Sequence, residues 1–221
     1  EDAPLRILQD FKTEQEYVLE AGDMLYLPPH VAHWGTAVGD CMTYSIGFRA
    51  PSAQELGTQF LTYLQETIAL EGMYTDMNLG LQKHPAEISD EMVRRVNTTL
   101  KKIRWDKDMV GEFLGRYLSE PKPHIIFNTP SNLRLDNFRK TLMTRGLNLD
   151  LKTQALFYEE MFFINGECVD MHVSWLACLK HLADRRKLSP DMFENNLLED
   201  ASLLELFYNW YLAGYVNCDK H

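Results

Sequence analysis

Apolar and polar residues in the first fifty positions alternate in short runs, a pattern typical of β-strands. The alternation is clearest over residues 42–48, where Thr43, Ser45 and Gly47 face one side and apolar residues face the other. Turn residues bound the runs, as at Ala21-Gly22-Asp23 and at Pro28-Pro29. The pattern predicts strands over residues 4–11, 17–20, 24–27, 33–38 and 42–48. Five short strands cannot close an eight-stranded barrel, so a barrel would need further strands from residues preceding Glu1.

From Ser52 onward the spacing of apolar residues changes to that of amphipathic helices. Ser52 and Glu55 form a capping-box pattern, followed by apolar residues every three or four positions. A second helix is predicted from Ser89 and a third over about residues 106–118. The second has a narrow apolar stripe, typical of a helix that packs on another helix, made of Val93, Val96, Leu100 and Ile103.

Prolines 121 and 123 predict a linker, because a helix cannot run through them, and a new unit after it. A helix is expected near residues 131–144, and Asn165-Gly166 between two apolar runs is a strong hairpin signal. Further helices are predicted over residues 173–185, 189–195 and 201–213, and the aromatic residues of the last are expected to be buried. The expected fold class is therefore α+β, with a hairpin and helices that suggest a winged-helix module at residues 120–221.

Composition restricts the class of protein. The chain has 221 residues, which is long enough for a sizeable core and for more than one domain. Its formal net charge is −10. No run of eighteen apolar residues and no charged-then-apolar leader is present, so we expect neither a membrane span nor a signal peptide. The four cysteines form no CxxC pattern and are interpreted as reduced thiols of a cytoplasmic protein.

The balance of charge in the last unit argues against nucleic-acid binding. Residues 121–221 hold eleven Lys and Arg against thirteen Asp and Glu, and only Arg185-Arg186-Lys187 forms a basic cluster. Binding to phosphates needs several basic groups on one face. The sequence therefore favours a protein-binding role for this unit, and the acidic chain is compatible with a basic protein partner.

Two stretches carry a resemblance to a known family. LEAGDMLYLPPHVAHWG at residues 19–35, followed by MTYSIGFRAP at residues 42–51, resembles the C-terminal half of the double-stranded β-helix in JmjC-type ribosomal oxygenases of the cupin superfamily. The most similar branch is bacterial: iron- and 2-oxoglutarate-dependent hydroxylases of an arginine in a large-subunit ribosomal protein. The resemblance implies a ribosomal protein substrate, Fe(II) and 2-oxoglutarate as cofactors, and a homodimer.

The resemblance also implies a division of the chain and roles for three residues. Residues 1–50 would be the last strands of the JmjC barrel, residues 51–119 a helical dimerisation domain and residues 120–221 a winged-helix-like domain. His33 occupies the place of the second histidine in a His-X-Asp…His iron triad, whereas Ser45 and Thr43 would be inward hydroxyls near 2-oxoglutarate. His30 lies in the Pro-Pro turn and is interpreted as a solvated loop residue.

One departure from the family pattern is important. None of the seven histidines is followed two residues later by a carboxylate, so the His-X-Asp part of the triad is absent. This chain alone is therefore expected to be inactive. A non-enzymatic cupin-like scaffold, in which His33 is incidental, is the main alternative, and a transcription regulator that uses the last unit is a weaker one.

Overall fold

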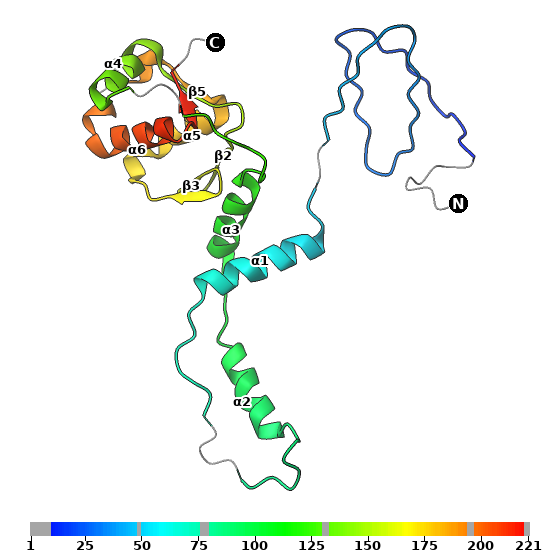
Figure 1. Ribbon diagram of the computed structural model, residues 1–221, viewed down its shortest axis with the longest axis vertical. Coiled ribbons are helices and arrows are strands. Elements are labelled where there is room, and N and C mark those ends of the chain that lie inside the picture. The colour runs from blue at the N-terminus through cyan, green and yellow to red at the C-terminus, as the bar shows by residue number, and fades with distance from the viewer. Residues whose placement is uncertain (1–9, 48–49, 76–79, 130–132, 194–196, 219–221) are drawn as a thin grey trace. The chain divides into compact units, whose positions relative to one another are not determined.

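The computed structural model describes residues 10–47, 50–75, 80–129, 133–193 and 197–218 (Figure 1). Contacts divide the chain into two units, Glu1–Arg49 and Ala50–His221, which we describe separately. Across these described residues, no helix combines the length and the apolar character needed to cross a membrane.

The first unit is irregular over the described residues 10–47 and contains no paired strand there. The turn at Gly22 is formed as expected: Asp23 N–H donates to the Glu20 carbonyl at 3.1 Å, and Gly22 has a φ of 101°. The prediction of paired strands within residues 17–47 is wrong for the described residues. A β-strand requires a hydrogen-bonded neighbouring strand, and no described segment here has one. The first predicted strand, residues 4–11, lies almost wholly outside the described residues, as does Phe48 of the last.

Apolar side chains of the first unit are consequently exposed. Met24 is 88% exposed and Trp34 is 76% exposed, although the alternating pattern places such residues in a protein interior. The alternation thus indicates which side chains would be buried if another layer of structure packed on this segment. It does not itself provide that layer.

The second unit follows the predicted order of elements closely. Its helices are α1 (Ala53–Thr67), α2 (Asp90–Leu100), α3 (Lys107–Ser119), α4 (Leu135–Arg145), α5 (Leu176–Arg185) and α6 (Ala201–Leu212). Its strands are β1 (Leu147–Leu149), β2 (Ala155–Tyr158), β3 (Met161–Ile164), β4 (Glu167–Val169), β5 (Lys187–Leu188) and β6 (Val216–Asn217). Short 3-10 turns cover Val173–Trp175, Pro190–Phe193 and Leu197–Glu199, so the helix expected at residues 189–195 is a single 3-10 turn over its described part.

The predicted helix starts are confirmed by capping hydrogen bonds. Ser52, Ser89 and Asp106 each accept, through a side-chain oxygen, a hydrogen bond from the backbone N–H three residues later. These bonds satisfy N–H groups that have no partner within the first turn of a helix.

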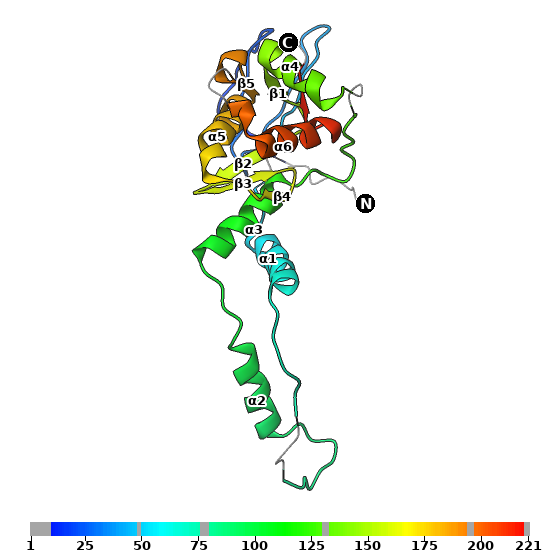
Figure 2. The same ribbon diagram turned by 90° about the vertical axis from the view of Figure 1, so that its left-hand side faces the viewer.

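Two small antiparallel sheets organise the last part of the chain. One has the order β5-β1-β6 and the other the order β2-β3-β4. The Asn165-Gly166 turn joins β3 to β4 with Ile164 opposite Glu167, which confirms the predicted hairpin. Together with the helices, the sheets confirm the α+β class (Figure 2).

The core lies between the sheets and helices α4, α5 and α6. Phe138, Phe162 and Phe207 are completely buried, and Phe162 stacks on Trp210 with ring centroids 6.0 Å apart. The aromatic residues of α6 thus lie in the core, as expected. Burial also raises the pKa of the Cys178 thiol to about 12, so it stays a neutral thiol at physiological pH.

Helix α3 lies against the β2-β3-β4 sheet with its backbone directly over aromatic rings. A methyl group at Gly111 would overlap the ring of Tyr158, and one at Gly115 would overlap the ring of Phe163. At the end of α3, the buried Ser119 hydroxyl donates to the Gly115 carbonyl at 2.7 Å and accepts from Gly166 N–H at 2.9 Å. Two glycines one helical turn apart therefore let the helix approach the sheet, and a serine fixes its end.

The opposite side of α3 packs on α1 through aromatic rings. Phe113 of α3 lies edge-on to Phe60 of α1 with centroids 5.3 Å apart, and the Tyr117 hydroxyl donates to the Glu55 carboxylate at 2.8 Å. Helix α3 thus joins α1 to the sheet.

We expect Gly115→Ala to destabilise the protein by about 2 kcal/mol, because the added methyl group must displace the buried ring of Phe163. Gly57→Ala in α1 is the matched control, since nothing lies within 4 Å of the added methyl group. It should stabilise the protein by about 0.5–1 kcal/mol through helix propensity. Chemical denaturation measures both, and equal effects of the two substitutions would contradict the close packing of α3.

Candidate functional site

His33 lies two residues after the Pro28–Val31 turn, in which Val31 N–H donates to the Pro28 carbonyl at 3.3 Å. Its Nδ1 is 3.3 Å from the Val31 carbonyl oxygen, and the residue is exposed. A carbonyl oxygen only accepts hydrogen bonds, so this contact is a hydrogen bond in the tautomer that carries the proton on Nδ1. The lone pair of Nε2 then faces away from this contact, which is the arrangement that a histidine needs to bind a metal.

Thr43 and Ser45, the other two predicted site residues, lie in the same irregular unit. Both are exposed, and neither forms a side-chain hydrogen bond with the described part of the chain. Their hydroxyls are thus accessible, but the described residues do not bring them together with His33.

The described residues do not form a complete metal site. They contain no group of three or more His, Cys, Asp or Glu side chains that could hold an ion. An iron centre of the expected kind uses two imidazoles and one carboxylate. His33 fits the part of one ligand, and the described chain supplies no second or third ligand beside it.

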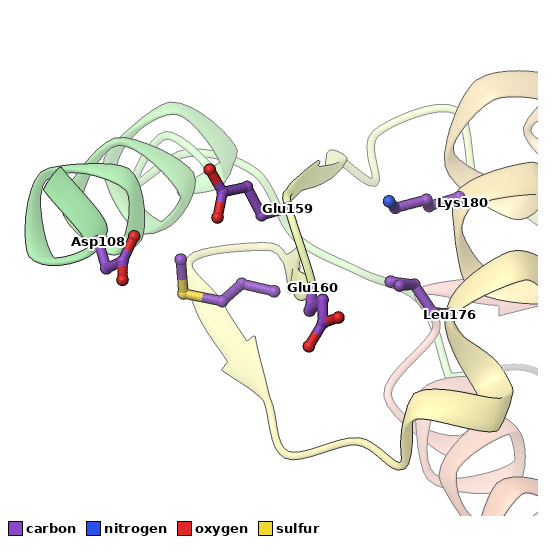
Figure 3. A pocket seen from close by; sticks show the side chains of 6 residues that line it. Asp108, Glu159, Glu160, Leu176 and Lys180 are labelled. Atoms are coloured by element: carbon purple, nitrogen blue, oxygen red, sulfur yellow. The ribbon is translucent and has the colours of Figure 1, made fainter.

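A pocket of about 550 Å³ lies between the β2–β3 turn and α5 (Figure 3). Its lining combines three carboxylates, two apolar side chains and one ammonium group: Asp108, Glu159, Glu160, Met161, Leu176 and Lys180. Lys180 projects from α5 toward the turn, and its Nζ lies 5.0 Å from the ring centroid of Phe157. Sequence patterns did not single out this pocket; the only signal was a pair of glutamates in a tight turn between two apolar runs.

The charges of this pocket are only partly paired. Glu159 forms an ion pair with Lys107, with 3.0 Å between Oε1 and Nζ. The ammonium group lowers the pKa of the Glu159 carboxyl. Asp108 and Glu160 have no basic partner in the described chain. The pocket therefore has an acidic character that disfavours a phosphate or another anion.

One residue of the basic cluster predicted within residues 121–221, Arg186, is used inside the protein. Arg186 adopts a left-handed backbone with a φ of 59°, and its guanidinium donates to the Asp150 carbonyl at 2.7 Å and the Thr153 carbonyl at 3.1 Å. Helix α6, the most apolar helix, contains no Lys or Arg. Arg185 and Lys187 of that cluster stay exposed.

Two family descriptions match the chain. The JmjC domain matches residues 1–56, and the ROXA-like winged helix matches residues 102–217. The first match contains His33, Thr43 and Ser45, and the second contains α3 and the two sheets.

Two curated proteins are similar to this chain. A "Probable ribosomal oxygenase" of Haemophilus influenzae is 46% identical over 229 residues, which cover 90% of this chain and 54% of the relative. The "Ribosomal protein uL16 3-hydroxylase" of Escherichia coli is 26% identical over 199 residues, which cover 89% of this chain and 52% of the relative. The chain thus spans about half the length of these relatives.

Solved structures of the Escherichia coli ribosomal oxygenase YcfD share the fold. One superposes with a TM-score of 0.61 at 21% identity, covering 79% of this chain and 48% of that protein. Another structure, of YcfD in complex with cobalt and 2-oxoglutarate, has a TM-score of 0.60 at 21% identity. The match covers 78% of this chain and 47% of that protein. At this identity the likeness concerns the fold alone.

We expect Arg186→Ala to destabilise the protein by about 2 kcal/mol, because two backbone carbonyls lose a charged donor. Lys187→Ala removes an exposed charge of the same cluster and should leave stability unchanged within about 0.5 kcal/mol. Chemical denaturation compares the two. Titration with duplex DNA at low salt should detect no binding by the wild type, and strong, salt-dependent binding lost in Arg186→Ala would show that the arginine serves nucleic acid instead.

Proposed function

Because this chain belongs to the ROXA-like winged-helix family, whose description matches more than half of its residues, we propose that it is part of a ribosomal oxygenase. The intact enzyme would be an Fe(II)- and 2-oxoglutarate-dependent dioxygenase that hydroxylates a ribosomal protein, with an arginine side chain as its target. The observation that carries the proposal is the JmjC match over the residues that contain His33.

His33 is the metal ligand that this chain contributes. A hydrogen bond from Nδ1 to the Val31 carbonyl, 3.3 Å away, would leave Nε2 for the metal. The other two ligands would come from a His-X-Asp motif, which this chain lacks. Residues 1–221 alone would therefore be inactive.

Bound Fe(II) and 2-oxoglutarate would supply the oxidising chemistry with dioxygen as the oxidant: one oxygen atom would enter the substrate as a hydroxyl group, and the other would enter the succinate that forms as 2-oxoglutarate loses carbon dioxide. Ser45 and Thr43 would donate hydrogen bonds to a carboxylate of 2-oxoglutarate: both are exposed, and two residues apart they would face one side if this segment paired as a strand. A ribosomal substrate would place the enzyme in the cytoplasm.

We further propose the division that the resemblance implies: barrel strands at 1–50, a dimerisation domain at 51–119 and a winged-helix-like domain at 120–221. Helix α3 would belong to the second part by sequence and to the third by its packing on β2, β3 and β4. The net charge and the internal use of Arg186 favour a protein-binding role for the last part over nucleic-acid binding.

The second copy of a homodimer would cover α2. This helix has no buried residue: Val93, Val96 and Leu100 of its predicted apolar stripe are exposed, and so is Met92 beside them. A stripe of this kind packs on another helix, and no described residue of the chain covers it. A second α2 has the same stripe and would match it by two-fold symmetry.

The proposed activity is tested in the intact protein. With Fe(II), 2-oxoglutarate and a ribosomal-protein peptide that contains arginine, we expect a mass increase of one oxygen atom on the arginine, detected by mass spectrometry. His33→Ala should abolish this turnover, because one of the three ligands is lost. His84→Ala, a substitution of an exposed histidine outside the proposed site, is the matched control and should retain full activity.

Absence of turnover in the intact wild type, or full activity of His33→Ala, would favour the non-enzymatic scaffold instead. Hydroxylation of a different side chain would leave the oxygenase in place and overturn only the arginine assignment.

The proposed dimer is tested by Val96→Asp, which puts a charge in the middle of the exposed stripe. We expect the intact protein to become monomeric in sedimentation velocity, because burying an unpaired carboxylate in an apolar interface is costly. Thr98→Asp introduces the same charge on the opposite side of α2 and should leave the dimer intact. A wild-type monomer, or dissociation by both substitutions alike, would contradict the role of the stripe.

A further inference from the structure

Asn165-Gly166 is the one Asn-Gly pair of the sequence, and it forms the loop between β3 and β4. Both residues have a left-handed backbone, with φ of 49° at Asn165 and 89° at Gly166. Asparagine is thermally labile, most of all before glycine, because glycine has no Cβ to shield its backbone nitrogen from the asparagine side chain. The hairpin turn therefore carries a candidate site of spontaneous chemical modification.

The modification is deamidation, in which the asparagine side chain reacts with the backbone that follows it. The Gly166 nitrogen gives its proton to water and attacks Cγ of Asn165. The new N–Cγ bond closes a succinimide ring, and the Cγ–Nδ2 bond breaks as Nδ2 takes up a proton and leaves as ammonia. Water then opens the ring at one of its two carbonyl carbons and leaves aspartate or isoaspartate at this position.

In the folded chain, both reacting groups are held by other parts of the protein. Gly166 N–H donates to Ser119 Oγ at 2.9 Å, and Ser119 is completely buried at the end of α3. Asn165 Oδ1 accepts from Gln154 N–H at 3.0 Å. The proton that must leave is therefore directed at a buried hydroxyl, and the amide group that must be attacked is fixed by Gln154.

The nitrogen of the same amide group is not held in this way. Asn165 is 7% exposed, and its Nδ2 has no hydrogen-bond partner among the described residues. The side chain is thus fixed through its oxygen alone. Nothing in the described part of the chain retains the nitrogen that would leave as ammonia, so protection depends on the contacts of Gly166 N–H and of Oδ1.

We propose that Asn165 is a latent deamidation site, which Ser119 protects as long as the end of α3 lies against the hairpin turn. Opening of this contact frees the Gly166 nitrogen and exposes the pair to water. The reaction then prevents the contact from forming again. Aspartate puts an unpaired carboxylate at a buried position, and isoaspartate lengthens the backbone of a tight hairpin loop. Deamidation therefore makes a transient opening of α3 from the sheet permanent.

The test uses the intact protein and is independent of its turnover. Native and guanidinium-unfolded wild type are incubated at mildly alkaline pH, and conversion of Asn165 is followed by peptide mass spectrometry with an isoaspartate assay. We expect conversion in the native protein to be at least about tenfold slower than in the unfolded protein, because it requires a local opening. Ser119→Ala should accelerate conversion in the native protein about tenfold, as for the loss of one buried hydrogen bond.

Leu142→Val is the matched control, since it shortens a completely buried side chain of α4 and leaves both hydrogen bonds of the loop in place. It lowers global stability, but native conversion should stay within about twofold of the wild type, because the local opening is unaffected. Equal rates in native and unfolded wild type would overturn the inference. So would a Ser119→Ala rate that does not exceed the Leu142→Val rate.

Hydrogen exchange of the wild type provides a second measurement that does not depend on the folding of Ser119→Ala. The Gly166 amide should be protected, because its N–H donates to the buried Ser119 hydroxyl. Exchange of this amide at the rate of an unfolded chain would overturn the proposal.

Discussion

The close approach of α3 to the β2-β3-β4 sheet is the constraint on which the described part of the second unit depends. Gly111 and Gly115 put the helix backbone over the rings of Tyr158 and Phe163, and Ser119 closes the end of the helix on the hairpin turn at Gly166. Because α1 packs on the other side of α3, this one helix contacts both the sheet and the helical part. A winged-helix-like module and a helical segment are thus joined through a packed element and not only through a linker.

Local signals predicted the second unit well, because its elements are specified by neighbouring residues. Ser52, Ser89 and Asp106 mark helix starts through capping bonds that span three residues, and Asn165-Gly166 encodes its own turn. The packing of α3 could not be predicted this way. From sequence alone, a glycine in a helix indicates only a weak helix former. Its role in close packing becomes visible only when the aromatic ring beside it is located.

The first unit shows the opposite relation between pattern and structure. Residues 42–48 alternate as a strand should, yet a ladder needs a partner strand and none of the described residues provides one. The same applies to the site: the family resemblance predicted His33 as a ligand, but one imidazole does not make an iron centre. His30, expected to be a solvated loop residue, is exposed in the turn.

The central claim is that His33 supplies one ligand of a metal centre whose other ligands this chain lacks. Calorimetric titration of the intact, metal-free protein with Co(II) tests it most directly. The account predicts one tight site per chain in the wild type and a loss of affinity of about tenfold or more in His33→Ala. Equal affinity and stoichiometry in the two proteins, or no stoichiometric binding by the wild type, would contradict it.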